Sequence, residues 1–361
     1  AHSPKNGIKA QTYTNHIRGV ITLAKQYASE AGRYSKDDRV LLQQLAEAAA
    51  EYHDLGKLDF ENQKVLSGEV AAKALPVNHV DAGAAHWLNN QRSSCFCAAI
   101  TQAHHIGFPD FSAEMNKGDF IFRDTQIAAT VDQRLTTLEA IHDSLIAKRR
   151  LTPIHENISS DRSVFLRMLL SCIADADHTD TARYYRKYPQ QEQYLPLRAG
   201  ERLARLDECV TDLQQKGSAT QRNALRSEMY QACRNADIQS DISSCDSPVG
   251  SGKTTAVMAH LLAQAQKRGL RRIFVVLPFT NIIRQSVEIY RKMLTLPGEN
   301  SEEVVAELHH RADFESENAR YLTSLWRAPI IVTTAVAFFE TLASNSTGTL
   351  RRLHELPGSA V

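Results

Sequence analysis

The spacing of apolar residues divides the chain near residue 240. From 16 to 180, apolar residues recur three and four positions apart and no alternating pattern persists, which predicts a mainly helical domain. Two apolar series with this spacing stand out, at 41–50 and 164–173. Residues 196–240 are polar but favour helix, so we predict a helical connector there.

After residue 245 the pattern changes to an alternation of helix and strand. An amphipathic helix is predicted over 255–268, followed by a buried strand over 273–277 and a second strand over 330–334. A short and polar strand is expected over 243–245, ahead of the helix. Alternating strands and helices imply a parallel sheet of the RecA type.

These patterns predict three parts of the chain. They are a mainly α domain over 1–195, the helical connector over 196–240, and an α/β RecA-like lobe with a parallel sheet over 241–361. The third part is too short for two RecA-like lobes, so we expect a partial motor.

Composition narrows the class of protein. The 361 residues are 43% hydrophobic, enough for a sizeable core, and no run approaches the roughly 18 apolar residues that cross a bilayer. The N-terminus has no apolar signal-peptide core, and the six cysteines lack disulfide or zinc spacing, so we expect a cytoplasmic protein without a membrane partner. A net charge of +1 confines nucleic-acid binding to local basic clusters.

Histidine and aspartate residues in the first domain have the pattern of a metal site. The dipeptide His53-Asp54 precedes Gly56-Lys57, and transition metals favour imidazole and carboxylate ligands. Asp54 has two oxygens and could bridge two ions about 4 Å apart, the arrangement used in phosphodiester cleavage. We place His53 and Asp54 on one helix, about 100° apart, so that both reach one pocket. The candidate ligands are His16, His53, Asp54, His79, His104, His105 and Asp177.

Two assignments near this candidate site, the role of Lys57 and the choice of Asp177, have alternatives. Lys57 could neutralise a scissile phosphate and so joins His53 and Asp54 as a candidate catalytic residue, but a surface ion pair explains it equally well. Asp175 and Asp177 lie about 200° apart on a helix, so only one of them can face the metals.

The segment Ser247–Thr254 has the spacing of a phosphate-binding loop ahead of a helix. Its glycines let backbone N–H groups close around phosphate oxygens, and the helix dipole favours the negative charge. Lys253 would reach the β- and γ-phosphates and Thr254 would bind magnesium, so ATP with magnesium is expected. The acidic magnesium partner of a motor is missing, because the only Asp-Glu pair, Asp207-Glu208, precedes the loop in a helical context. The predicted ATP contacts are Ser247, Val249, Gly250, Ser251, Gly252, Lys253 and Thr254.

Two further segments follow the buried strands, Leu277–Asn281 with Gln285 and Val332–Thr334 with Phe338. With Ala1-His2-Ser3, the candidate ligands and the phosphate loop, they give an order of motifs that resembles the CRISPR-associated helicase-nuclease of type I systems, the effector called in by the Cascade complex. The resemblance spans nearly the whole chain. It makes the two segments helicase motifs Ia and Ib, and it favours Asp177 over Asp175, because Ala176, Asp177 and Thr181 fit the family pattern.

The resemblance implies an HD-superfamily nuclease domain that cuts single-stranded DNA, followed by the opening part of an ATP-dependent 3′-to-5′ superfamily 2 helicase. The family degrades the DNA strand displaced when a guide RNA pairs with its target. The implied partners are this single strand and Cascade, and an anti-CRISPR inhibitor protein is a further candidate. Motifs Ia and Ib imply DNA contacts by Pro278, Thr280, Asn281, Thr333 and Thr334.

Two divalent transition metals, drawn from iron, manganese, cobalt and nickel, suit such histidine-rich ligation. One ion would be held by His16, His53, Asp54 and Asp177, and the other by Asp54, His79, His104 and His105.

Two other functions remain open from the sequence. One is an HD phosphohydrolase of nucleotides with an accessory NTP-binding lobe, and the other is a non-catalytic adaptor bound to DNA. An experiment that compares metal-dependent cleavage of circular single-stranded DNA with hydrolysis of free dNTPs distinguishes the nuclease, the phosphohydrolase and the adaptor.

Overall fold

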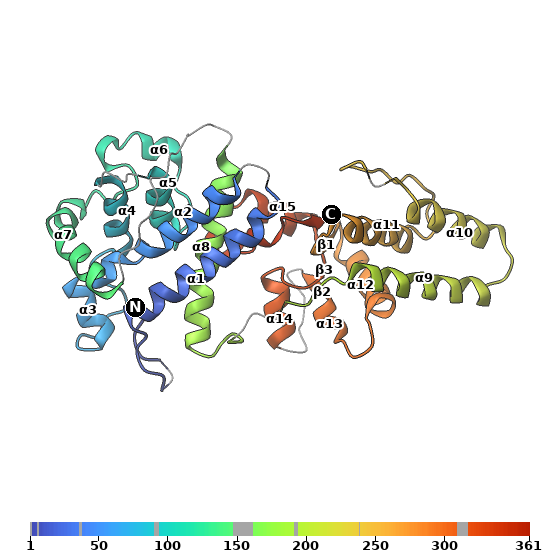
Figure 1. Cartoon of the computed structure of the whole chain (residues 1–361), viewed down its shortest axis with the longest axis horizontal. Helices are drawn as coiled ribbons and strands as arrows, with labels where there is room; N and C mark the ends of the chain where they lie inside the picture. The colour runs from blue at the N-terminus through green and yellow to red at the C-terminus, as the bar shows by residue number, and fades with distance from the viewer. Residues whose placement is uncertain are drawn as a thin grey trace. The chain divides into compact units, whose positions relative to one another are not determined.

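The chain forms two compact units in the computed structural model, which describes residues 2–5, 7–35, 38–89, 94–146, 162–190, 194–237, 239–308 and 317–361 (Figure 1). The helical unit comprises Ala1–Gln191 and Thr341–Pro357. The sheet unit comprises Glu192–Glu340 and Gly358–Val361.

The helical unit is built around three long helices that pack on one another, α1, α2 and α8. Their apolar faces bury one continuous core, in which Ile17, Leu45 and Leu169 are fully enclosed. The helices of this unit are α1 Tyr13–Gly32, α2 Arg39–Tyr52, α3 Phe60–Ser67, α4 His79–Asn89, α5 Cys95–Ala103, α6 Phe111–Met115, α7 Ala128–Leu145, α8 Ser163–Tyr184 and α16 Thr347–Leu350, with 3-10 turns η1 Leu55–Leu58, η2 Gly118–Phe120 and η4 Leu353–Glu355.

The segment 341–357 belongs to the helical unit, although the sequence pattern placed it in the RecA-like lobe. Leu350 and Leu353 are buried in the helical core. Arg351 donates two hydrogen bonds to Asp175 on α8, at 2.9 and 2.6 Å. This segment therefore packs with helices that lie far from it in the sequence.

The described residues of the sheet unit form four parallel strands in the order β2-β3-β1-β4. The strands are β1 Arg272–Leu277, β2 Val305–Leu308, β3 Ile330–Thr334 and β4 Ser359–Ala360. The helices are α9 Ala199–Lys216, α10 Gln221–Arg234, α11 Lys253–Arg268, α12 Thr280–Leu294, α13 Ser301–Val304 and α14 Glu317–Ser324, and α15 Ala335–Ala343 crosses the unit boundary.

The main elements of the sheet unit agree with the sequence pattern. The predicted helix and both buried strands are present, and the helix ends at Gly269, whose φ of 63° is in the left-handed region. The predicted connector forms α9 and α10, which pack against α11. The strand expected over 243–245 is wrong, because these polar residues are exposed and in no sheet. Among the described residues, no helix is long and apolar enough to cross a membrane.

Candidate metal centre and phosphate loop

The His53-Asp54 pair lies just past the end of α2. His53 is the C-terminal cap of that helix, and Asp54 has left the helical conformation, with φ −110° and ψ 18°. The prediction that both residues share one helix is therefore wrong. Gly56 then passes close to the backbone of His79, where a Cβ would lie 2.4 Å from the carbonyl oxygen.

Five separate segments bring all seven candidate ligands into one cluster. His16 comes from the first turn of α1, His79 begins α4, His104 and His105 follow the end of α5, and Asp177 lies on α8. The ligand atoms of Asp54, His79, His104 and His105 lie within 4.8 Å of one another, as do those of His16, His53 and Asp54. The first group is the second predicted ligand set, and the other holds three of the four residues of the first set. His53, His104 and Asp177 also lie within 4.8 Å of one another, across the predicted division.

The two carboxylate oxygens of Asp54 face different imidazoles. Its Oδ2 lies 3.2 Å from His16 Nε2 and 3.5 Å from His53 Nε2. Its Oδ1 lies 3.5 Å from His79 Nε2 and 3.8 Å from His104 Nε2. A carboxylate placed in this way can supply one oxygen to each of two ions.

Three of these histidines are oriented by hydrogen bonds at Nδ1. His53 and His104 bond the carbonyl oxygens of Ala50 at 2.8 Å and Thr101 at 2.6 Å. His16 Nδ1 lies 2.7 Å from Asp180 Oδ2. Such partners fix the ring and leave Nε2 directed into the cluster, as in metal sites where a second layer of groups orients the ligands.

The buried polar atoms of the cluster test whether metal ions fit. His53 Nε2, His104 Nε2 and Asp54 Oδ1 are buried and have no hydrogen-bond partner in the described part of the chain. An unpaired polar atom costs free energy when buried, and a metal ion bound to it removes that cost. The donors are imidazole nitrogens and carboxylate oxygens, so the residues fit divalent transition metals.

The electrostatics of the cluster favour the metal-binding forms of most ligands. Burial lowers the pKa of His53 and His104, and it lowers the pKa of His79 to about 4. Burial opposes ionisation of Asp54, but the positive charge of Lys57 holds the pKa of this carboxyl well below its ordinary value. Neutral imidazoles and an ionised carboxylate are the forms that bind a metal.

His16 is the exception among the imidazoles. Burial disfavours its charged form, but hydrogen bonds to Asp177, Asp180 and Asp54 outweigh burial and raise its pKa to about 10. Its Nε2 lies 3.2 Å from both Asp54 and Asp177. A metal ion bound here would therefore displace a proton from His16.

Lys57 is buried beside the cluster, so a surface ion pair does not describe it. It lies in η1, and its Nζ is 2.6 Å from Asp54 Oδ2. The amine thus adds a positive charge to the same pocket as the candidate ligands.

Asp175 and Asp177 have different surroundings on α8. Asp177 is directed into the cluster, where its Oδ1 lies 3.2 Å from His16 Nε2. Asp175 accepts hydrogen bonds from Arg351, outside the cluster. The geometry therefore agrees with the choice of Asp177.

Sequence reasoning gave no role at the cluster to three residues that border it, and it named one of them, His2, only as part of the motif Ala1-His2-Ser3. Asp180 orients His16, and its position three residues after Asp177 on the same helix face was the available signal. Thr347 donates a hydrogen bond to the carbonyl oxygen of His105 at 2.9 Å, which no local pattern indicates. His2 lies with its ring centroid 4.8 Å from that of His16, and burial lowers its pKa to about 3.

The predicted phosphate loop connects an extended segment to α11. Gly250 and Gly252 have φ of 85° and 86°, which glycine adopts without strain. Lys253 begins α11, and its Nζ donates to the carbonyl oxygen of Ser247 at 2.6 Å. Arg226 on α10, which sequence reasoning missed, donates to the carbonyl oxygen of Gly250 at 3.0 Å. The loop is thus preformed at a helix N-terminus.

The other predicted ATP contacts surround these residues. The hydroxyls of Ser247 and Ser251 are hydrogen-bonded to each other. Val249 is fully exposed, and the carbonyl oxygen of Thr254 accepts a bond from Tyr290. Asp207 accepts a hydrogen bond from Tyr230 at 2.7 Å, in keeping with the helical context assigned to the Asp-Glu pair.

Motifs Ia and Ib lie at one edge of the sheet. Strands β1 and β3 are parallel, and Leu277 pairs with Thr334, so the residues that follow both strands share the carboxyl edge. Pro278 and Asn281 are exposed and Thr280 is half-buried. Thr333 is fully buried and donates to the carbonyl oxygen of Leu308 at 3.0 Å, so it supports the sheet and does not present a DNA contact.

Comparison with known proteins finds a family match in the second half of the chain. Residues 222–356 match the family described as DEAD/DEAH box helicase. No curated protein matches the chain by sequence.

The fold of the chain is similar to that of Cas3 from T. fusca. Its AMPPNP complex has a TM-score of 0.57 at 16% identity and covers 99% of this chain. Another T. fusca Cas3 structure and its ATP complex have TM-scores of 0.55 and 0.54, again at 16% identity, and cover 99% and 98% of this chain. In each case the match covers 45% of the Cas3 chain, so this chain spans less than half its length.

Proposed function

We propose that the protein is a metal-dependent single-stranded DNA nuclease coupled to an ATP-dependent 3′-to-5′ helicase. The helical unit would be an HD-type nuclease domain, and the sheet unit would be part of the first RecA-like lobe. The observation that carries the nuclease is Asp54, whose two oxygens face two separate sets of imidazoles. The DEAD/DEAH match and the preformed phosphate loop support the helicase.

The residues have distinct roles in the proposed nuclease. His16, His53, Asp54 and Asp177 would hold one metal ion, and Asp54, His79, His104 and His105 the other. When bound, two such ions supply an activated water and neutralise charge on the phosphate. Asp180 fixes the ring of His16. Lys57, whose amine lies in the same pocket, would attract the DNA phosphate.

The proposed motor uses the phosphate loop and the carboxyl edge of the sheet. Backbone N–H groups of residues 249–253 would bind the phosphates of ATP, Lys253 would bind the β- and γ-phosphates, and Thr254 would bind magnesium. The exposed residues Pro278 and Asn281, with Thr280 and Thr334, would contact the DNA strand. This edge is where ligands bind in open parallel sheets.

The similarity to T. fusca Cas3 supports a role in type I CRISPR interference. In this role Cascade would recruit the protein, which would then degrade the displaced strand. An anti-CRISPR protein that covers either site would inhibit it.

A nucleotide phosphohydrolase is the second candidate, because the same metal cluster could act on dNTPs. The helicase match and the placement of motifs Ia and Ib on one exposed edge favour DNA as the substrate.

The test compares two substrates of the purified protein in manganese or cobalt. We expect cleavage of circular single-stranded DNA, which offers no ends, and no release of phosphate from free dNTPs. The control is Asp54→Ala, which should lose the cleavage. Hydrolysis of dNTPs without cleavage of the circle would establish the phosphohydrolase instead, and binding of the circle without either reaction would establish the non-catalytic adaptor.

A further inference from the structure

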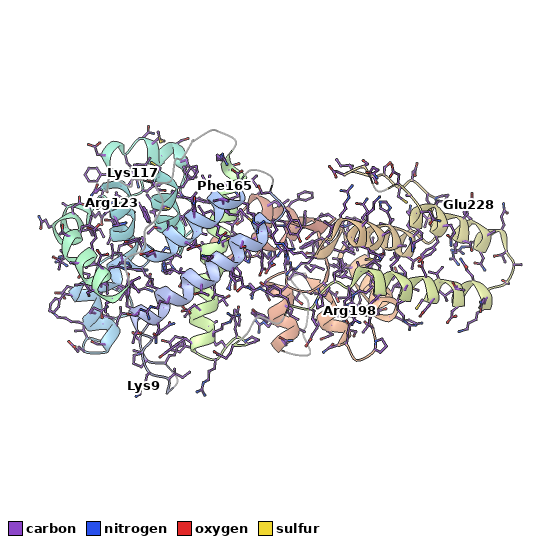
Figure 2. All side chains as sticks on the ribbon, in the orientation of Figure 1. Lys9, Lys117, Arg123, Phe165, Arg198 and Glu228 are labelled. Atoms are coloured by element: carbon purple, nitrogen blue, oxygen red, sulfur yellow. The ribbon has the colours of Figure 1, made fainter. Side chains whose placement is uncertain are left out.

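A short hairpin brings a further histidine to the metal cluster. Residues 2–11 fold back on themselves, with antiparallel bridges between His2 and Gln11 and between Lys5 and Ile8; Ala1 and Asn6 lie outside the described residues. Lys9, labelled in Figure 2, is exposed on this N-terminal hairpin.

The N-terminal hairpin is fastened to α8, the helix that carries Asp177. Tyr184 donates to the carbonyl oxygen of Ala10 at 3.1 Å, and Tyr185 donates to that of Ser3 at 2.6 Å. Gln11 Nε2 donates to Asp180 Oδ2 at 2.7 Å. Both strands of the hairpin are therefore anchored to the helix, which fixes the position of the residue at its start.

His2 is directed to the same side of the cluster as Asp177. One ring nitrogen, Nε2, lies 3.0 Å from the hydroxyl oxygen of Thr181. Its ring meets the ring of His16 edge-on, and His2, His16 and Asp177 each offer a ligand atom within 4.8 Å of the others. The hairpin, α1 and α8 thus each bring one residue to the same point.

We propose that His2 is a ligand of the metal ion held by His16 and Asp177. This inference rests on the proposed function, because it assigns one more donor to that centre. A third imidazole on this side, after His16 and His53, makes the ligand set richer in nitrogen. Such a set binds cobalt and nickel more strongly than manganese, and magnesium most weakly.

The test measures metal binding without relying on catalysis. Cobalt(II) is titrated into metal-free protein, and binding is followed by calorimetry and by the visible absorption of the bound ion, which depends on its ligands. The variants are His2→Ala and His2→Gln; the second keeps a polar side chain in case the first disturbs the hairpin. Lys9→Ala is the matched control, since Lys9 is exposed on the same hairpin.

We expect the unmodified protein and Lys9→Ala to bind two cobalt ions with the same spectrum. Both His2 variants should bind one of the two ions at least about 10- to 100-fold more weakly, with a changed spectrum. Unchanged affinity and spectrum in both His2 variants would overturn the assignment of His2 and leave the proposed function intact. Failure of the unmodified protein to bind any transition metal would overturn the proposed nuclease and this ligand together.

Discussion

The buried pair of Asp175 and Arg351 offers a sharp test of how the helical unit is held together. The Asp175 side chain is fully buried and that of Arg351 is 14% exposed. Two of the three guanidinium nitrogens, Nε and Nη2, contact one carboxylate oxygen, at 2.9 and 2.6 Å. Replacing Arg351 by alanine leaves a charged carboxylate inside the protein with its main partner gone.

The expected loss of unfolding free energy follows from this burial. Removing one partner of a buried ion pair typically costs about 3–5 kcal/mol. His354 Nε2 stays 3.7 Å from the other oxygen of Asp175, and the vacated space admits water, so we expect the lower end, about 3 kcal/mol. A surface pair is worth under about 1 kcal/mol, so Lys25→Ala, which breaks the half-exposed pair with Glu47, is the control.

The assay must follow the helical unit alone, because a two-unit protein need not unfold in one step. The chain has two tryptophans, Trp87 in the helical unit and Trp326 in the sheet unit. In a Trp326→Phe background, urea unfolding followed by tryptophan fluorescence reports the unfolding of the helical unit. The double variant Asp175→Asn with Arg351→Met should recover much of the loss, because no buried charge remains. A loss no greater than that of Lys25→Ala would refute the reasoning.

Three further predictions concern the sites. Asp54→Ala should abolish cleavage of single-stranded DNA and reduce the binding of both metal ions, with the circular dichroism spectrum retained; loss of only one ion would show that Asp54 does not bridge. In a longer chain that also carries the rest of the motor, Lys253→Ala should leave metal-dependent nicking of single strands but stop ATP-driven degradation of duplex; loss of nicking without ATP would contradict the separation of the two sites. Gly56→Ala would place a Cβ 2.4 Å from the carbonyl oxygen of His79. It should therefore lower the free energy of unfolding by about 1–3 kcal/mol, measured by urea unfolding, and weaken metal binding, measured by calorimetry. Gly68→Ser, at a position with open space around it, should leave metal binding unchanged.

The sequence predicted the candidate ligands because few residue types have their chemistry. Imidazole and carboxylate groups in a mainly helical, apolar context restrict the choices, and all seven residues converge in the structure. The alternation of helix and strand likewise predicted the parallel sheet, because that periodicity reflects which face each element buries.

What the local pattern missed depends on contacts between distant residues. After the turn that takes Asp54 off α2, Gly56 lies close to the backbone of His79, a contact that the local sequence does not indicate. Thr333 has the residue type of a DNA contact, but its place in β3 buries it. Segment 341–357 continues the helicase pattern, and only its packing against α8 reveals that it belongs to the helical unit.

The division of the helical unit into two stretches of sequence constrains the order in which it can fold during synthesis. Its first 191 residues leave the ribosome early, but Thr347, which bonds the carbonyl oxygen of His105, and Arg351, which pairs with Asp175, follow the phosphate loop and the first three strands. Chains grow from the N-terminus, so these supports form only after most of the sheet unit has been made. A nascent or prematurely ended chain therefore carries the candidate ligands without their full support. The geometry links completion of the histidine–aspartate cluster to prior synthesis of the phosphate loop.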